Sequence, residues 1–238
     1  MVQPKPNGEY YTISYEFDFK GGMRRRYSIR LDPDRISIAP SLDGFLPPAW
    51  TNLERCRCDV CPLTSEASPR CPAAANMAEL VDHFKNDCST DPVLVRVITP
   101  ERTYLKETEV QYGLLSILGI ILATSGCPVM NFLKPMARFH LPFSTHTETI
   151  VRSISIYLLR QYFRKRAGGE PDILLEELER KYAQIQKVNE GLLSRIRSVV
   201  SQGDADKNAI LILHAFSQLL SNEISEKLES LEYLFKEE

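Results

Sequence analysis

The residues best suited to chemistry are four cysteines that lie within sixteen consecutive positions. Cys56, Cys58 and Cys61 follow a Cys-x-Cys-x-x-Cys pattern, and Cys71 comes shortly after them. Neither packing nor local propensity calls for thiols at this density in a loop rich in Pro, Asp and Arg, so we expect a metal ion to hold them together. Four thiolates are the usual closed, tetrahedral shell of structural zinc. The sequence therefore predicts a zinc site at these four residues.

The spacing of the cysteines leaves alternatives open. The commonest zinc arrangement has two separated Cys-x-x-Cys pairs, and this pattern differs from it. Cys61, Cys71 and Cys127 are each followed by proline, as happens in the ligand run of bacterial ferredoxins, although the other spacings do not match that run. An iron–sulfur cluster in a redox or sensor protein is therefore the first alternative to zinc. Free or redox-active thiols are the second.

Cys127 is a candidate reactive thiol or extra metal ligand. It follows a helix-ending Gly126 and precedes a basic stretch, and positive neighbours lower the pKa of a thiol. A Cys127–His140 nucleophilic pair would make the protein a thiol enzyme. That pair has no recognisable orienting acid, and the chain contains no Gly-rich phosphate loop, Gly-x-Ser-x-Gly elbow or His-Glu-x-x-His motif. The sequence favours a non-enzymatic regulatory or adaptor protein.

A second candidate site lies between two predicted helices. Its four basic side chains alternate with aromatic and aliphatic ones, and the next helix begins at its end, where backbone N–H groups could add donors for an anion. These residues are Lys134, Arg138, His140 and His146. The alternative interpretation is a connector whose aromatic residues pack inward while its cations face water.

The overall charge excludes some classes of function. The net charge of −2 argues against general nucleic-acid binding. The charge is unevenly placed: residues 134–166 carry a net +6 and residues 170–238 a net −6. The first residues contain no apolar core of signal-peptide type, so we expect a cytoplasmic protein with reduced thiols.

The elements that must position these residues follow from hydrophobic periodicity. Residues 11–19 alternate between apolar and polar side chains, which is typical of a half-buried strand, and a Gly-Gly turn leads to a second strand over 24–31. Further predicted elements are a short strand within 35–39, a helix over 73–84, and a strand pair over 93–98 and 103–107. We expect one antiparallel sheet, interrupted by a metal-bearing excursion at about 50–88.

The rest of the chain is predicted to be helical, giving an α+β fold. Helices are expected over 109–124, 145–166, 172–200 and 206–235, and the last two would form a long αα-hairpin. Residues 110–133 carry no charge, but their strongly apolar part is too short to cross a bilayer, so we expect a buried core helix and no membrane span. The predicted regions are 1–107, 108–168 and 169–238. The hairpin is the expected surface for a protein partner or for dimerisation.

Overall fold

A five-stranded antiparallel sheet forms one side of the protein. The computed structural model describes residues 10–40 and 44–198, and residues 204–236 in part. The strand order is β3-β2-β1-β4-β5, with every neighbouring pair antiparallel. The strands are β1 (Tyr11–Phe19), β2 (Arg24–Asp32), β3 (Ser37–Ile38), β4 (Pro92–Ile98) and β5 (Thr103–Glu109). The single antiparallel sheet predicted from the sequence is confirmed.

The alternation of β1 explains its central place in the sheet. Ile13, Tyr15 and Phe17 are fully buried on one face, because successive side chains of a strand point to opposite faces. The β1–β2 hairpin closes through Gly21 and Gly22, whose φ angles of 97° and 88° suit glycine. The register of β1 with β2 and β4 then aligns the buried residues of all three strands.

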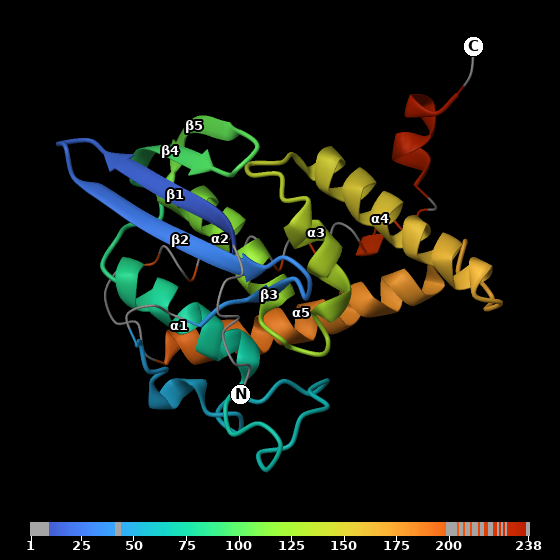
Figure 1. Cartoon of the computed structure of the whole chain (residues 1–238), viewed down its shortest axis with the longest axis horizontal. Helices are drawn as coiled ribbons and strands as arrows, with labels where there is room; N and C mark the ends of the chain where they lie inside the picture. Colours follow the sequence, from blue (N-terminus) through green and yellow to red (C-terminus); the bar gives the residue numbers. More distant parts are fainter. Residues whose placement is uncertain are drawn as a thin grey trace.

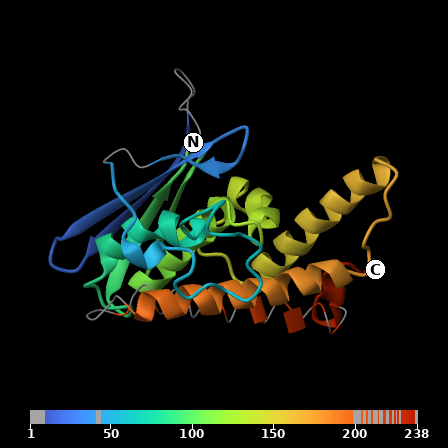
Figure 2. The ribbon, with the colours of Figure 1, turned by 90° about the horizontal axis from the view of Figure 1, so that it is seen from below.

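Helices cover the buried face of the sheet. They are α1 (Pro72–Phe84), α2 (Val110–Thr124), α3 (Lys134–Arg138), α4 (His146–Arg166) and α5 (Glu176–Arg197), with short 3-10 turns η1 (Ala49–Thr51), η2 (Asn131–Leu133) and η3 (Glu229–Leu234). Figure 1 shows α2 lying against the sheet and α3 leading from it towards α4. In Figure 2, α5 runs along one edge of the molecule, past both α1 and α4.

The uncharged stretch that follows β5 is a buried helix, as predicted. Most of α2 is inaccessible to solvent, and its closest approach to the sheet is at Gly113. A Cβ atom at that position would lie only 2.8 Å from Phe17 Cζ and 3.3 Å from Val95 Cγ2. Within the described part of the chain, no helix combines the length and apolar character needed to span a bilayer.

The C-terminal region is where the sequence-based prediction is least complete. Helix α5 begins at Glu176 rather than at residue 172, because Leu175 adopts a left-handed conformation with φ of 65°. The partner helix expected over 206–235 falls partly outside the described residues, so the αα-hairpin stays a prediction. Its last part differs from expectation, since Leu228 is also left-handed (φ 60°) and is followed by η3 instead of a continued α-helix.

Candidate functional site

The predicted four-cysteine metal function is wrong. Across the described residues, which include all six cysteines, no group of three or more His, Cys, Asp or Glu side chains is placed to hold a metal ion. Cys56 is exposed and has a left-handed backbone with φ of 50°. Cys58, Cys61 and Cys71 are half-buried, and all six cysteines are free thiols. A metal-binding regulatory function, with zinc or with an iron–sulfur cluster, is therefore not supported.

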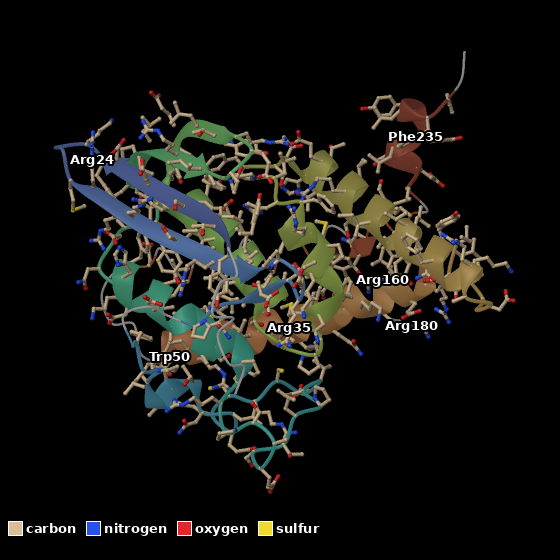
Figure 3. The ribbon with its side chains drawn as sticks, viewed as in Figure 1. Arg24, Arg35, Trp50, Arg160, Arg180 and Phe235 are labelled. Carbon is tan, nitrogen blue, oxygen red and sulfur yellow. The ribbon has the colours of Figure 1, made fainter. Side chains whose placement is uncertain are left out.

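An arginine of α5 anchors the segment that leads into the cysteine-bearing loop. Arg195 of α5 is 2% exposed, and its guanidinium donates to the carbonyl oxygens of Trp50 (2.9 Å), Asn52 (2.7 Å) and Leu53 (2.8 Å). Gly191, one turn earlier, lets the helix pass close to Cys58. A Cβ atom at position 191 would lie only 3.2 Å from the Cβ atom of Cys58. Figure 3 labels Trp50 where the loop meets the end of α5.

The thiols are poorly suited to nucleophilic catalysis. Burial, followed by the nearby Cys61, Cys127 and Cys71 thiols, raises the pKa of Cys58 to about 12. Burial also raises the pKa of Cys127. Because the thiolate is the nucleophile, a raised pKa makes each of these thiols less reactive. His140, the partner expected for Cys127, makes its hydrogen bonds with Tyr15 and Ser116. The thiol-enzyme alternative is therefore not supported either.

The predicted anion site is split between two surroundings. Lys134 donates to the carbonyl of Arg35 (3.4 Å) beside β3. The guanidinium of Arg138 lies 4.6 Å from the ring centroid of Tyr11 on β1. His140 and His146, in contrast, both line a cavity on the other side of the connector. Only these two of the four residues are brought together at one site.

That cavity has a volume of about 360 Å³ and lies between α2, α3, α4 and α5. Most of its wall is aliphatic or aromatic. The apolar lining comprises Leu115, Gly119, Leu122, Ala123, Met130, Leu133, Met136, Ala137, Leu141, Phe143 and Ile185. A side chain built at Gly119 would meet no atom within 4 Å, so this glycine opens the cavity from the middle of α2. Ligand pockets are commonly of this size and character.

A buried hydrogen-bonded group forms one part of the cavity wall. His140 Nε2 lies 2.6 Å from Tyr15 Oη and 3.1 Å from Ser116 Oγ, and the two hydroxyls are 2.9 Å apart. Burial, with a smaller contribution from the charge of Arg152, lowers the pKa of His140 to about 3. Burial also raises the pKa of Tyr15. All three groups are therefore neutral at physiological pH and act as hydrogen-bonding groups.

The cavity also contains a cation without an ion-pair partner. Nη2 of Arg152 donates to the carbonyl oxygens of Phe139 (2.6 Å) and Met136 (3.3 Å). Among the described residues no carboxylate lies within ion-pair distance of it. Glu148 acts on it electrostatically, but that carboxylate accepts from the backbone N–H of Thr145 (2.7 Å) in the capping box of α4. Burial lowers the pKa of Arg152, as expected of a cation that is partly desolvated.

Sequence reasoning missed the residues that define this cavity. Arg152, Arg195, Ser116 and Asn189 each lie inside a predicted helix, and no motif in the sequence marks them. The Glu148–Arg152 spacing places the two side chains on one face of α4, but it does not indicate that this face borders a cavity.

Comparison with known proteins gives one match. A family model described as "Domain of unknown function (DUF6901)" matches residues 13–236. No curated protein and no solved structure shows significant similarity to the chain.

Proposed function

The chain belongs to the DUF6901 family, and we propose that it is a binding protein for a small organic anion with an apolar body, held in the cavity between α2, α3, α4 and α5. The observation that carries the proposal is Arg152. A partly buried cation beside an apolar cavity is stabilised when an anion pairs with it. A carboxylate is the simplest such anion, because its two oxygens match the guanidinium fork.

The size of the cavity limits the ligand. A volume of about 360 Å³ lies within the range of about 300–1,000 Å³ that is typical of small-molecule sites, near its lower end. The apolar walls favour a hydrocarbon body, with each buried CH₂ contributing about 0.8 kcal/mol. A medium-chain carboxylate fits both the volume and the lining.

The geometry favours binding over catalysis. Ser116 Oγ lies 3.1 Å from His140 Nε2, as in a nucleophile–base pair. However, Ser116 lies within α2, where backbone N–H groups are used by the helix and cannot stabilise an oxyanion. Tyr15 Oη also lies 2.6 Å from the same imidazole nitrogen, which competes for its one donor or acceptor function.

Calorimetric titration with octanoate, decanoate and dodecanoate tests the proposal. We expect decanoate to bind, and Arg152→Gln to weaken its binding by about tenfold or more, because a desolvated charge pair is worth more than 1.4 kcal/mol. Gly119→Leu should abolish binding by filling the cavity. Arg160→Gln is the matched control: Arg160 lies on the same helix and also donates to a carbonyl, that of Phe132 (2.8 Å), but it does not line the cavity.

The result that overturns the proposal is equally concrete. If none of the three carboxylates binds at 1 mM to folded protein, or if Arg152→Gln binds decanoate as tightly as the unchanged protein, the cavity is not an anion site.

Two finer expectations from the sequence remain proposals alongside this one. A cytoplasmic location is supported by the free thiols of all six cysteines, since thiols stay reduced in that compartment. Self-association through the C-terminal helices rests on their apolar stripes, and light scattering that shows a strict monomer at tens of micromolar would contradict it.

A further inference from the structure

Asn189 is a buried amide in the cavity wall whose hydrogen bonding is incomplete. It lies on α5, is 2% exposed and lines the same cavity as Arg152. In the described part of the chain its Oδ1 has no hydrogen-bond partner. A buried acceptor left in this state costs about 1–3 kcal/mol, and native proteins contain few of them. Such a residue in a cavity wall calls for a partner from outside the chain.

Two hydroxyl groups that line the cavity with Asn189 are already engaged. Tyr182, two turns earlier on α5, has its hydroxyl 2.6 Å from Ser153 Oγ. Ser217, which also lines the cavity, donates its hydroxyl to the carbonyl of His214 (2.7 Å). Ile185, which lies between Tyr182 and Asn189 on α5, contributes only hydrocarbon to the wall. None of these neighbours donates to the amide of Asn189.

Asn189 and the cation lie at different levels of the cavity. Tyr182 is joined to Ser153, the residue next to Arg152, and the charge of Arg152 acts on the Tyr182 hydroxyl. Asn189 is seven residues further along α5, which corresponds to about 10 Å of helix rise. A single ligand that reaches both residues therefore carries polar groups at its two ends.

Building on the anion-binding function proposed above, we propose that the ligand carries a hydroxyl group at the end opposite its carboxylate, and that Asn189 recognises this hydroxyl. The carboxylate pairs with Arg152, the hydrocarbon chain lies along the apolar wall beside Gly119 and Ile185, and the hydroxyl reaches Asn189. A hydroxyl both donates and accepts, so it satisfies the amide whichever way the amide is turned about χ2. The ligand class is the medium-chain ω-hydroxycarboxylates.

Titration with decanoate and 10-hydroxydecanoate tests this inference, because the two probes differ only in the terminal hydroxyl. The unchanged protein should bind the hydroxy acid at least tenfold more tightly than decanoate. Asn189→Leu, a substitution of similar size, should reverse the preference, since a hydroxyl buried against leucine lacks a partner. Arg160→Gln serves again as the control and should retain the preference.

A second measurement remains informative even if Asn189→Leu binds poorly. Because the amide is under-satisfied without ligand, Asn189→Leu should leave the unfolding temperature of the ligand-free protein unchanged or raise it, whereas a residue with a purely structural role would lower it on substitution.

The outcomes separate this inference from the function on which it rests. If both probes bind the unchanged protein equally, or if Asn189→Leu keeps the preference for the hydroxy acid, a water molecule or the protein itself satisfies the amide and the hydroxyl inference is overturned, while the anion site stands. If neither probe binds, the anion site is overturned as well.

Discussion

Replacing Arg195 by alanine should lower the free energy of unfolding by about 4 kcal/mol, because this side chain joins α5 to the loop that carries the cysteines. Its guanidinium makes three hydrogen bonds of 2.7–2.9 Å to the carbonyls of Trp50, Asn52 and Leu53, and the side chain is 2% exposed. Hydrogen bonds to a charged group contribute about 1.5–3 kcal/mol each. The energies of the three hydrogen bonds do not add, because all three are made by one guanidinium group. The expected loss therefore lies near the middle of the roughly 3–5 kcal/mol that is typical when one partner of a buried charged network is removed.

Urea unfolding followed by tryptophan fluorescence is the suitable assay, because Trp50 is the chain's single tryptophan and one of the three acceptors. Arg197→Ala is the matched control: Arg197 is exposed on the same last turn of α5, and its removal should change stability by no more than about 0.5 kcal/mol. Arg195→Lys should lose most of the stabilisation, because an ammonium group cannot reproduce the planar fork that reaches three carbonyls.

A loss below about 1 kcal/mol for Arg195→Ala, in protein whose control behaves as expected, would refute the conclusion that this arginine organises the loop. The loop would then be held by its own packing.

Three further predictions concern stability and thiol reactivity. The pKa of His140 is about 3 in the folded protein and about 6.5 in the unfolded chain, so the unfolded chain binds the proton first as the pH falls. The free energy of unfolding should therefore decrease by about 2 kcal/mol between pH 7 and pH 5, and urea unfolding of His140→Gln should lack this decrease. Parallel pH profiles for the variant and the unchanged protein would contradict the prediction. Gly113→Ala should destabilise the protein by about 1–3 kcal/mol, because the added Cβ is crowded by neighbouring side chains. Gly119→Ala has open space around its Cβ and should stabilise the protein by up to about 1 kcal/mol. Equal effects of the two substitutions in thermal unfolding would show that α2 does not pack tightly on the sheet at Gly113. Iodoacetamide at pH 8 should alkylate exposed Cys88 well before Cys58, since a pKa of about 12 leaves about one Cys58 thiol in 10,000 ionised; peptide mass spectrometry finding Cys58 modified first would contradict this.

The strands and helices could be read from the sequence because their signals are local. The alternation in residues 11–19 specifies β1, since period two matches the pleat of a strand. The capping box at Thr145 and Glu148 marks the start of α4, and the structure contains both of its reciprocal hydrogen bonds. The uncharged run after residue 109 indicates a buried helix, and α2 is buried.

The cysteine pattern shows the limit of such reading. The positions of Cys56, Cys58, Cys61 and Cys71 along the chain look like a ligand set, and all four line one small pocket beside α5, but they do not form a group that could hold a metal ion. The left-handed backbone at Cys56 and the close packing of Gly191 against Cys58 are consequences of how the loop docks on α5, which no spacing rule contains.

The sequence by itself determined the order and type of most elements, the single antiparallel sheet, the burial of α2 and the start of α4, because these depend on the periodicity of side chains within one segment. Only the tertiary structure decided that Arg195 fastens the cysteine loop, that Lys134 and Arg138 turn away from His140 and His146, and that Arg152 and Asn189 share one cavity. The physical reason is that a site is made of groups from different elements. Their meeting depends on packing angles and helix positions set by the whole core, whereas the chain encodes each group only at its own position.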